Sequence, residues 1–208
     1  MAETILDQAT WPRAGHFALF RTYERPHFAT TARVDVTGLL ALAKPRGVSP
    51  YRACLYAIGT GLHQVAELRT RMRGETVVQH DAVAMSMTVP TPDGSFVYGY
   101  VPYHADFATF DAEAARVIDT AAQGGLNPHA GSDAVAYLSC LPWLDFTAID
   151  NALPNARDCI PRISWGRFTA QGDGRWDMAM AIQVHHALVD GAHVGAYFAA
   201  VQAALDAI

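Results

Sequence analysis

The sequence predicts a domain of mixed strands and helices around one central sheet, of the α+β or α/β class. Short runs of β-branched, aromatic or apolar residues are separated by turn signals, which is typical of strands. Elsewhere apolar residues recur at steps of three and four, the spacing of an amphipathic helix. The chain has 208 residues, 51% of them hydrophobic, and shows neither an internal repeat nor a linker. A single domain with one sizeable core is therefore expected.

The first half of the chain is predicted to contain two helices and a group of strands. Residues 11–20 form a short helix candidate, and Ser49-Pro50 opens a second helix, because serine caps helices and proline is favoured at the first position. The buried stripe of that second helix is expected to consist of Leu55, Ile58, Leu62 and Val65. Strands are expected at 31–36, 68–72, 76–78 and 82–89, with Gly74 at a turn.

The second half begins with a Pro-Thr-Pro-Asp-Gly turn at 90–94 and again alternates strands with two helices. Apolar residues between Phe107 and Ile118 predict the first helix, which Gly124-Gly125 is expected to end. The last helix is predicted by Val194, Phe198, Val201, Leu205 and Ile208. Strands are expected at 96–103, 135–139, 163–168 and 178–184, the last two joined as a hairpin by a Gln-Gly-Asp-Gly turn at 171–174.

Composition and charge narrow the class of protein. A net charge of −5 gives no electrostatic footprint for nucleic acid or for an anionic membrane. No apolar run reaches the length of a membrane span, and the N-terminus lacks a basic region followed by an apolar stretch. The chain has three cysteines, Cys54, Cys140 and Cys159, and so small and odd a number does not indicate a disulfide framework. We therefore expect a cytoplasmic protein with reduced thiols.

The segment His185-His186-Ala187-Leu188-Val189-Asp190-Gly191 is the main functional candidate. It lies between the predicted buried strand at 178–184 and the C-terminal helix, so an imidazole there can be held at the mouth of a cleft. Histidine is the side chain best suited to move protons near neutral pH. Asp190 stands where a helix N-cap is expected. A lone histidine is more often part of a packed core, and histidines with a carboxylate can also bind a metal. Alternation along the strand turns His185 away from His186, however, so no metal site is expected.

Four landmarks in the same order give this chain a family resemblance. They are Trp11-x-Arg13-x-x-His16-Phe17, Glu67-Leu68-Arg69, Leu138-Ser139-x-Leu141-Pro142-Trp143 ahead of Phe146, and Gln183 to Gly191 followed by His193-Val194-Gly195. Together they resemble the type A chloramphenicol acetyltransferases. A bare His-x-x-x-Asp-Gly motif is shared with dehydrogenase-complex acyltransferases and condensation domains, whereas the ordered set is specific.

The resemblance implies one chloramphenicol-acetyltransferase-like domain over residues 1–208. Its fold would be α+β, a two-layer mixed sheet with helices, as in CoA-dependent acyltransferases. The chain would assemble as a homotrimer with active sites at subunit interfaces. Acetyl-CoA would be a co-substrate, with no permanently bound cofactor, and chloramphenicol or a similar small hydrophobic alcohol would be the acceptor.

The resemblance also implies roles for single residues. His186 would be the general base, with His185 in structural support. Asp190 would pair with Arg13 and hold the geometry of the site. Ser139 would donate a hydrogen bond to the tetrahedral oxyanion, although a serine at a strand end is by itself usually a turn residue.

Further positions match the substrate pockets of the family. Leu19, Phe20, Phe96 and Ser164 match the acceptor side, and Trp143 and Phe168 match the coenzyme side. Phe20 stands where relatives have a tyrosine, so a phenol that contacts the antibiotic is lost, and Ser164 stands where they usually have a threonine. Aromatic side chains at such positions are also the usual material of a core.

Two other functions fit the same residues. One is a related acyl-CoA-dependent acyltransferase that acts on a different small-molecule hydroxyl or amine, because pocket shape decides acceptor choice. The other is a protein that kept the fold, lost the chemistry and binds a hydrophobic ligand.

Overall fold

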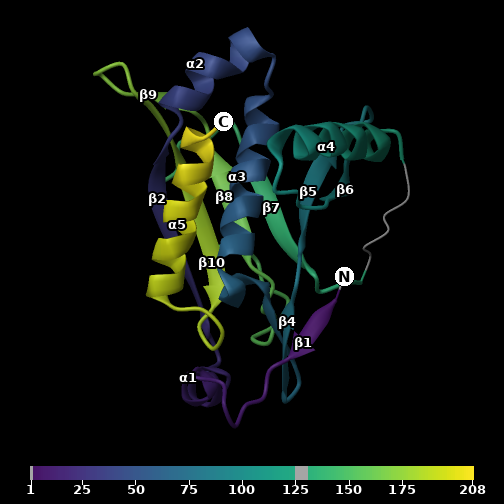
Figure 1. The fold of residues 1–208 in the computed structure, drawn as a ribbon, viewed down its shortest axis with the longest axis vertical. Helices are drawn as coiled ribbons and strands as arrows, with labels where there is room; N and C mark the ends of the chain where they lie inside the picture. The colour runs from purple at the N-terminus through teal and green to yellow at the C-terminus, as the bar shows by residue number, and fades with distance from the viewer. Residues whose placement is uncertain (1, 125–130) are drawn as a thin grey trace.

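A seven-stranded mixed sheet carries the fold (Figure 1). The computed structural model describes residues 2–124 and 131–208, so Gly125 of the predicted Gly-Gly helix end lies outside the described residues. In chain order the elements are β1 (Glu3–Ile5), α1 (Ala14–Phe20), β2 (His27–Asp35), α2 (Thr37–Arg46), α3 (Pro50–Gln64), a 3-10 helix (Ala66–Arg69), β3 (Thr70–Arg73), β4 (Thr76–His80), β5 (Ala84–Pro90), β6 (Phe96–Val101), α4 (Phe107–Ala122), β7 (Val135–Leu141), β8 (Arg162–Gly166), β9 (Thr169–Ala170), β10 (Trp176–His185) and α5 (Gly191–Asp206).

The topology assigns the chain to the α+β class. The main sheet has the order β2-β10-β8-β7-β5-β6, with the short β9 beside β10. The pairs β5–β7 and β7–β8 are parallel, and the remaining pairs are antiparallel. A separate three-stranded antiparallel sheet has the order β1-β4-β3.

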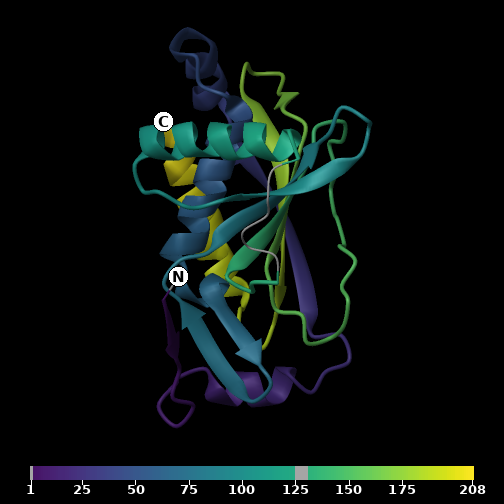
Figure 2. The same ribbon diagram turned by 90° about the vertical axis from the view of Figure 1, so that its right-hand side faces the viewer.

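Helices cover one face of the main sheet, as Figures 1 and 2 show. Helices α3 and α5 pack against each other there, and α4 contacts β5 and β6. The opposite face is faced by the chain segment 142–161, which Figure 2 shows standing off from the strands. The core between the sheet and its helices includes all four residues of the predicted stripe: Leu55, Ile58 and Leu62 are fully buried, and Val65 is buried too. Between this segment and the strands lies a cavity, in which Asn151 and Ala152 line the same space as the strand residues Ser86 and Ser164.

Local signals account for the helix ends. The Ser49 side chain accepts a hydrogen bond from the backbone N–H of Arg52 at 3.4 Å, and Pro50 begins α3, as predicted. The Asp106 side chain caps α4 in the same way through Thr109. Gly124 follows α4 with a φ of +81°, a conformation that favours glycine.

Three local predictions differ from the structure. Residues 66–69 form a 3-10 helix where we expected the strand 68–72 to begin. The backbone N–H of Leu68 donates to the Val65 carbonyl within this helix, and the Leu68 side chain is buried there. Neither α2 nor β1 was expected. Helix α2 has almost no amphipathic spacing, and β1 is three exposed residues paired to β4.

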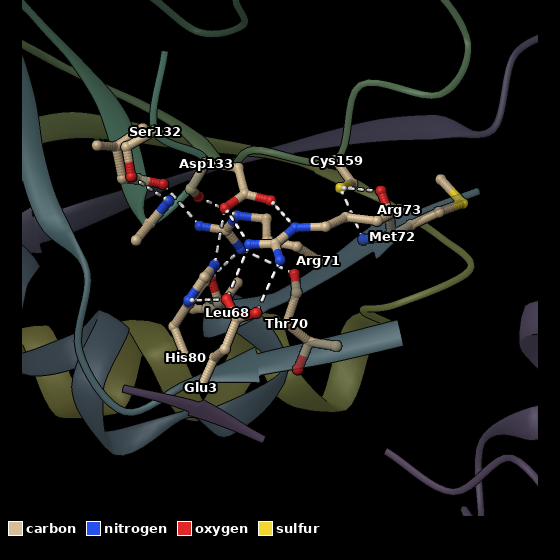
Figure 3. Close-up of polar contacts among 12 residues, drawn as sticks. Glu3, Leu68, Thr70, Arg71, Met72, Arg73, His80, Ser132, Asp133 and Cys159 are labelled. Atoms are coloured by element: carbon tan, nitrogen blue, oxygen red, sulfur yellow. Dashed lines mark hydrogen bonds and ion pairs between the residues drawn. The ribbon is translucent and has the colours of Figure 1, made fainter. Parts of the chain in front are cut away.

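A buried arginine anchors the small sheet to the main one (Figure 3). Arg71 is fully buried, and its guanidinium donates hydrogen bonds to four backbone carbonyls, those of Leu68, Thr70, Asp133 and Val135. Beside it, Arg73 pairs with the carboxylates of both Glu3 and Asp133 at 2.7–2.8 Å. These contacts fix β1 and β3 against the chain that enters β7, and so they position β7 itself.

Two histidines, the half-buried His63 and the buried His185, have both ring nitrogens in hydrogen bonds with the backbone. His63 donates from Nδ1 to the Gly59 carbonyl, and its Nε2 accepts from the Val83 N–H at 3.2 Å. In His185, Nδ1 accepts from the Ala187 N–H and Nε2 donates to the Ala156 carbonyl, both at 3.1 Å. In each ring a proton on the accepting nitrogen would face an N–H donor. Burial lowers the pKa of each to about 4.

We expect the free energy of unfolding to fall as the pH drops below about 6.5. The unfolded chain protonates His63 and His185 near that pH, whereas the folded chain resists protonation until the pH is about 4. Each histidine therefore costs up to about 1.4 kcal/mol per pH unit across this window. Urea unfolding at pH 7 and pH 5 measures the loss. A His185→Gln variant, which cannot titrate, should lose less stability than the parent over the same interval, and equal losses would contradict the assignment.

Among the described residues, no helix has both the length and the apolar character needed to cross a membrane.

Candidate active site

The histidine motif forms a turn at one end of the central strand. Strand β10 ends at His185 and α5 begins at Gly191, so residues 186–190 connect them, as the sequence predicts. The backbone N–H of His186 donates to the Pro26 carbonyl at 2.8 Å, which ties the turn to the chain entering β2. Helix α1 lies at the same end of the molecule (Figure 1).

The His186 ring has a defined tautomer. Its Nδ1 lies 3.1 Å from the Val189 carbonyl oxygen, which can only accept, so Nδ1 carries the proton. Nε2 is therefore left with a lone pair. Phe20 stacks on the ring, with centroids 3.9 Å apart and planes at 9°, and Phe28 packs at 4.9 Å. The ring is half-buried and fixed on two sides.

His185 points elsewhere. Its side chain is buried under the chain near Ala156 and meets the His27 ring edge-on at 4.9 Å. With both ring nitrogens engaged by the backbone, it has no free group for proton transfer. Its geometry is that of structural support for the turn, as expected from strand alternation.

Arg13 holds the turn from the other end of the chain. Its guanidinium donates to the Asp190 carboxylate at 2.6 Å, to the His186 carbonyl at 2.8 Å and to the Ala187 carbonyl at 3.2 Å. The expected pair with Asp190 is therefore present, and Arg13 itself is buried. Two of its three acceptors are backbone carbonyls of the motif, one of them that of His186 itself. Arg13 therefore fixes the position of His186 directly as well as through Asp190.

Asp190 has both of its expected contacts. Besides Arg13, its side chain accepts from the N–H groups of Ala192 and His193, as an N-cap of α5. Burial raises the pKa of Asp190, but the Arg13 hydrogen bond and the nearby His193 lower it by more, so the pKa lies below its usual range. The carboxyl is a charged anchor.

His193 completes this N-terminus of α5 in a way that the sequence did not indicate. Its Nδ1 accepts from the Asp190 N–H at 3.1 Å, a role that Glu or Gln usually has in a capping box. Nε2 lies 3.5 Å from the Glu67 carboxylate, so two of the sequence landmarks meet in space. A histidine three residues after the N-cap aspartate is the sequence signal that could have predicted this capping box.

Ser139 and Ser164 lie in a second cluster, on the sheet face opposite the helices. They are in register on the parallel strands β7 and β8, and both line a cavity of about 450 Å³. The full lining is Ser86, Thr88, Tyr98, Tyr100, Tyr137, Leu138, Ser139, Asn151, Ala152, Arg162, Ile163 and Ser164. Most of these residues were not predicted from the sequence. Only Ser139 and Ser164 were.

Within one chain the two clusters do not meet. Ser139 is in register with Ser164, and Ser164 with Ala181 on β10, five residues before His186. At about 3.3 Å per residue and about 4.8 Å between strands, the Ser139 and His186 backbones are roughly 19 Å apart. That is too far for one small reacting group to touch both side chains.

The remaining predicted pocket residues lie outside both clusters, except for Phe20. Leu19 and Phe96 are more than half exposed, and Trp143 is 75% exposed. Phe168 is packed against the core and lines a separate hollow with Leu40 and Trp176. Large exposed apolar side chains of this kind often mark an interaction surface. The described part of the chain contains no group of three or more histidine, cysteine or acidic side chains placed to hold a metal ion.

Solved structures with the same fold define the class of protein. The fold is the mixed α+β fold of CoA-dependent acyltransferases. A dihydrolipoamide acetyltransferase of Azotobacter vinelandii superposes with a TM-score of 0.68 over 93% of this chain and 86% of that one, at 20% identity, which shows the fold alone. A solved chloramphenicol acetyltransferase superposes with a TM-score of 0.90 over 98% of this chain and the whole of that one, at 28% identity.

The family follows from the sequence match. The profile of the family described as "Chloramphenicol acetyltransferase" matches residues 1–202. A chloramphenicol acetyltransferase from Proteus mirabilis is 30% identical over 199 residues, 92% of this chain and 89% of the relative. The chain belongs to the chloramphenicol acetyltransferase family, whose members are acyltransferases with acetyl-CoA as co-substrate. The resemblance and the α+β class expected from the sequence are thereby confirmed.

Proposed function

We propose that this chain is an acetyl-CoA-dependent O-acetyltransferase that acetylates the primary hydroxyl of chloramphenicol, and so inactivates the antibiotic. The observation that carries the proposal is the His186 ring, whose Nδ1–H is held by the Val189 carbonyl and whose Nε2 is left as a base. Family membership supports the co-substrate, and the related chloramphenicol acetyltransferases support the acceptor. The protein would act in the cytoplasm.

The reaction would be a direct transfer in a ternary complex. Nε2 of His186 takes the proton of the acceptor hydroxyl while its oxygen attacks the thioester carbonyl. The carbonyl becomes a tetrahedral oxyanion, to which the Ser139 hydroxyl donates a hydrogen bond. The C–S bond then breaks, the ester is released, and the CoA sulfur takes the proton back from His186. No acyl-enzyme would form, because Ser139 serves as the oxyanion donor and no G-x-S-x-G nucleophile motif surrounds it.

Arg13 and Asp190 would position this base without reacting. Arg13 carries a fixed charge against the two carbonyls of the turn, and Asp190 holds Arg13 while capping α5. Ser164, in register with Ser139, would supply a further hydroxyl on the acceptor side.

The separation of the two clusters supports a homotrimer with shared sites. Strand register and spacing put His186 and Ser139 roughly 19 Å apart within one chain. His186 of one protomer would therefore meet Ser139 of its partner. A head-to-tail interface closes into a ring when its rotation closes, and three copies would make the ring that the family resemblance implies. The exposed Leu19 and Phe96 would then become buried with Phe20 on the acceptor side, and Trp143 and Phe168 would face the coenzyme.

Phe20 favours a second candidate function, a related acyltransferase for another small-molecule hydroxyl or amine. Its ring lies flat on His186 and carries no hydroxyl, so no phenol is available there to bind the acceptor. The stacked Phe20 ring therefore selects the acceptor that approaches Nε2 more by its shape than by hydrogen bonding.

A thiol-release assay tests the proposal. Purified protein with acetyl-CoA is offered chloramphenicol, then a panel of alcohols and amines, and CoA–SH is followed with a thiol reagent. We expect turnover with chloramphenicol. Turnover with another acceptor and none with chloramphenicol would make that acceptor the substrate in place of the antibiotic. Binding of the antibiotic without thiol release under any condition would favour a non-catalytic ligand-binding protein and overturn the proposal.

A further inference from the structure

One peptide group of the His186 turn has a hydrogen bond on each side. The peptide between Val189 and Asp190 offers its carbonyl oxygen to Nδ1 of His186 at 3.1 Å. The N–H of the same group, which belongs to Asp190, donates to Nδ1 of His193, also at 3.1 Å. The proposed base and the His193 ring are therefore joined through a single planar peptide group.

The hydrogens along this chain of contacts all point the same way. His186 donates from Nδ1 to the peptide group, and the peptide group donates to Nδ1 of His193. Nδ1 of a neutral His193 is thus an acceptor, so the proton of that ring lies on Nε2. Hydrogen bonds that run in one direction polarise one another. A charge at the His193 end is therefore felt at His186.

Glu67 supplies a negative charge at that end. Nε2 of His193 lies 3.5 Å from Oε1 of Glu67, at the distance of an ion pair. The backbone of Glu67 is held in the 3-10 helix, in which Leu68 is fully buried and the Thr70 N–H donates to the Glu67 carbonyl. The carboxylate is therefore presented to His193 from a fixed support.

The charged and titratable groups beside the base are already engaged. Arg13 and Asp190 form an ion pair at 2.6 Å, and Arg13 also donates to the His186 carbonyl. His185 has both ring nitrogens in hydrogen bonds with the backbone. The two charges of the ion pair largely offset each other at the His186 ring. These groups therefore give a positive charge on His186 little net stabilisation.

The His193 ring stands between two carboxylates. Its Nδ1 lies 3.1 Å from Oδ1 of Asp190, and its Nε2 faces Glu67. Arg69, two residues after Glu67, donates from both terminal nitrogens to backbone carbonyls and offsets the charge of Glu67 only from a distance. Asp190, in contrast, is directly paired with Arg13. Of the two carboxylates, Glu67 is the one whose charge is less matched.

We propose that Glu67 is a positioning residue that stabilises the protonated form of His186 through His193 and the 189–190 peptide group. The proposal rests on the proposed acetyl transfer, in which Nε2 of His186 gains the proton of the acceptor. No proton moves along the chain of contacts. Each donor keeps its hydrogen, while the charge of Glu67 favours the positive charge that develops on His186. In hydrolase triads a carboxylate contacts the ring of the base directly. Here the carboxylate acts from a distance.

Glu67→Gln tests the proposal, because it removes the charge and keeps the shape of the side chain. With protonated His186 less stabilised, the midpoint of the kcat/KM profile should move to lower pH by about half a unit, as expected for one charge roughly 10 Å away along a partly exposed path. The kcat on the plateau should fall by up to about threefold, the factor that half a pH unit represents. KM for the acceptor should not change.

Glu113→Gln is the matched control. Glu113 lies in α4, and its side chain is 29% exposed, against 35% for Glu67. Its loss should leave the pH profile and kcat as they are in the parent. A merely structural role of Glu67 would lower kcat without moving the profile, and that result would overturn the proposal.

His193→Gln separates the chain of contacts from a direct effect through space. Glutamine is a usual residue at this position of a capping box, so its amide oxygen accepts from the Asp190 N–H and α5 stays capped. It has no ring to connect the peptide group with Glu67. In this background Glu67→Gln should move the midpoint by less than about 0.1 unit, because the two changes remove one pathway. A full half-unit shift would show that Glu67 acts without His193, which contradicts the proposal.

Nuclear magnetic resonance of protein with labelled histidines follows the His186 ring without any substrate. Its signals are identified by their loss in His186→Gln, and their titration midpoint should fall by about half a unit in Glu67→Gln. If thiol release fails with every acceptor while this shift is present, the proposed function is wrong and the role of Glu67 toward His186 stands. If acetyl transfer occurs and the midpoint does not move, the role of Glu67 is wrong and the proposed function stands.

Discussion

His186→Ala should lower kcat for acetyl transfer by about 10²–10⁴, the usual contribution of a positioned general base. The ring is held by the Val189 carbonyl and by Phe20, and its Nε2 is the group available to take the proton. Truncation removes that base while leaving Arg13, which grips the backbone carbonyls of residues 186 and 187, in place. Initial rates of thiol release at saturating acetyl-CoA, over a range of acceptor concentrations, give kcat and KM separately.

His104→Ala provides the control, because His104 precedes α4 and lies in neither cluster. Its kcat should match that of the parent. Activity of the His186 variant within about tenfold of the parent would be too high for the loss of a general base, and the assignment of His186 would then fail.

Ser139→Ala should lower kcat by about 10²–10³, equivalent to about 2.7–4 kcal/mol, the effect of removing one oxyanion donor. The hydrogen bond is needed in the transition state, so KM for the acceptor should change little. Steady-state kinetics of the purified variant measure both. A rise in KM with kcat unchanged would instead make Ser139 a binding residue.

Mixing the two inactive variants gives the sharpest test of where the site is built. If His186 and Ser139 meet from different protomers, an interface that takes His186 from the Ser139→Ala chain and Ser139 from the His186→Ala chain is intact. Random association of equal amounts makes about a quarter of such interfaces wild-type, by symmetry of a head-to-tail ring. Co-refolded mixtures should therefore recover about 25% of the parent activity. Recovery no greater than the sum of the two variants would show that each site lies within a single chain.

The sequence predicted the fold well where spacing or capping chemistry acts locally. Helix α3 follows from Ser49-Pro50 and its apolar stripe, and the turn between β10 and α5 follows from where a buried strand gives way to helical spacing. Helix α2 was missed because no amphipathic pattern marks it and a proline lies inside it. Strand β1 was missed because it is short and exposed and depends on pairing with β4.

The site divides in the same way. The motif residues could be predicted because they are contiguous in the sequence. Arg13 and Ser139 were predicted only through the family resemblance, because long-range contacts bring each of these two residues into place. No local signal marks Ser86, which lines the same cavity as Ser164 only once β5, β7 and β8 are aligned. The lining of a cavity is a property of the packed structure, so it cannot be taken from the order of residues.

The grip of Arg13 on the His186 turn has a consequence for the growing chain. Arg13 lies 173–177 residues from its three acceptors, so the His186 turn gains its anchor only after nearly all of the polypeptide has been synthesised. Closing so long a loop is entropically costly and is a late event for a nascent chain. A ribosomal product that stops before β10 has the hydroxyl-lined strands β5 to β8 but neither the base nor the acceptors for Arg13, which leaves that arginine without its partners. Products that stop before β10 would thus lack the proposed base, His186.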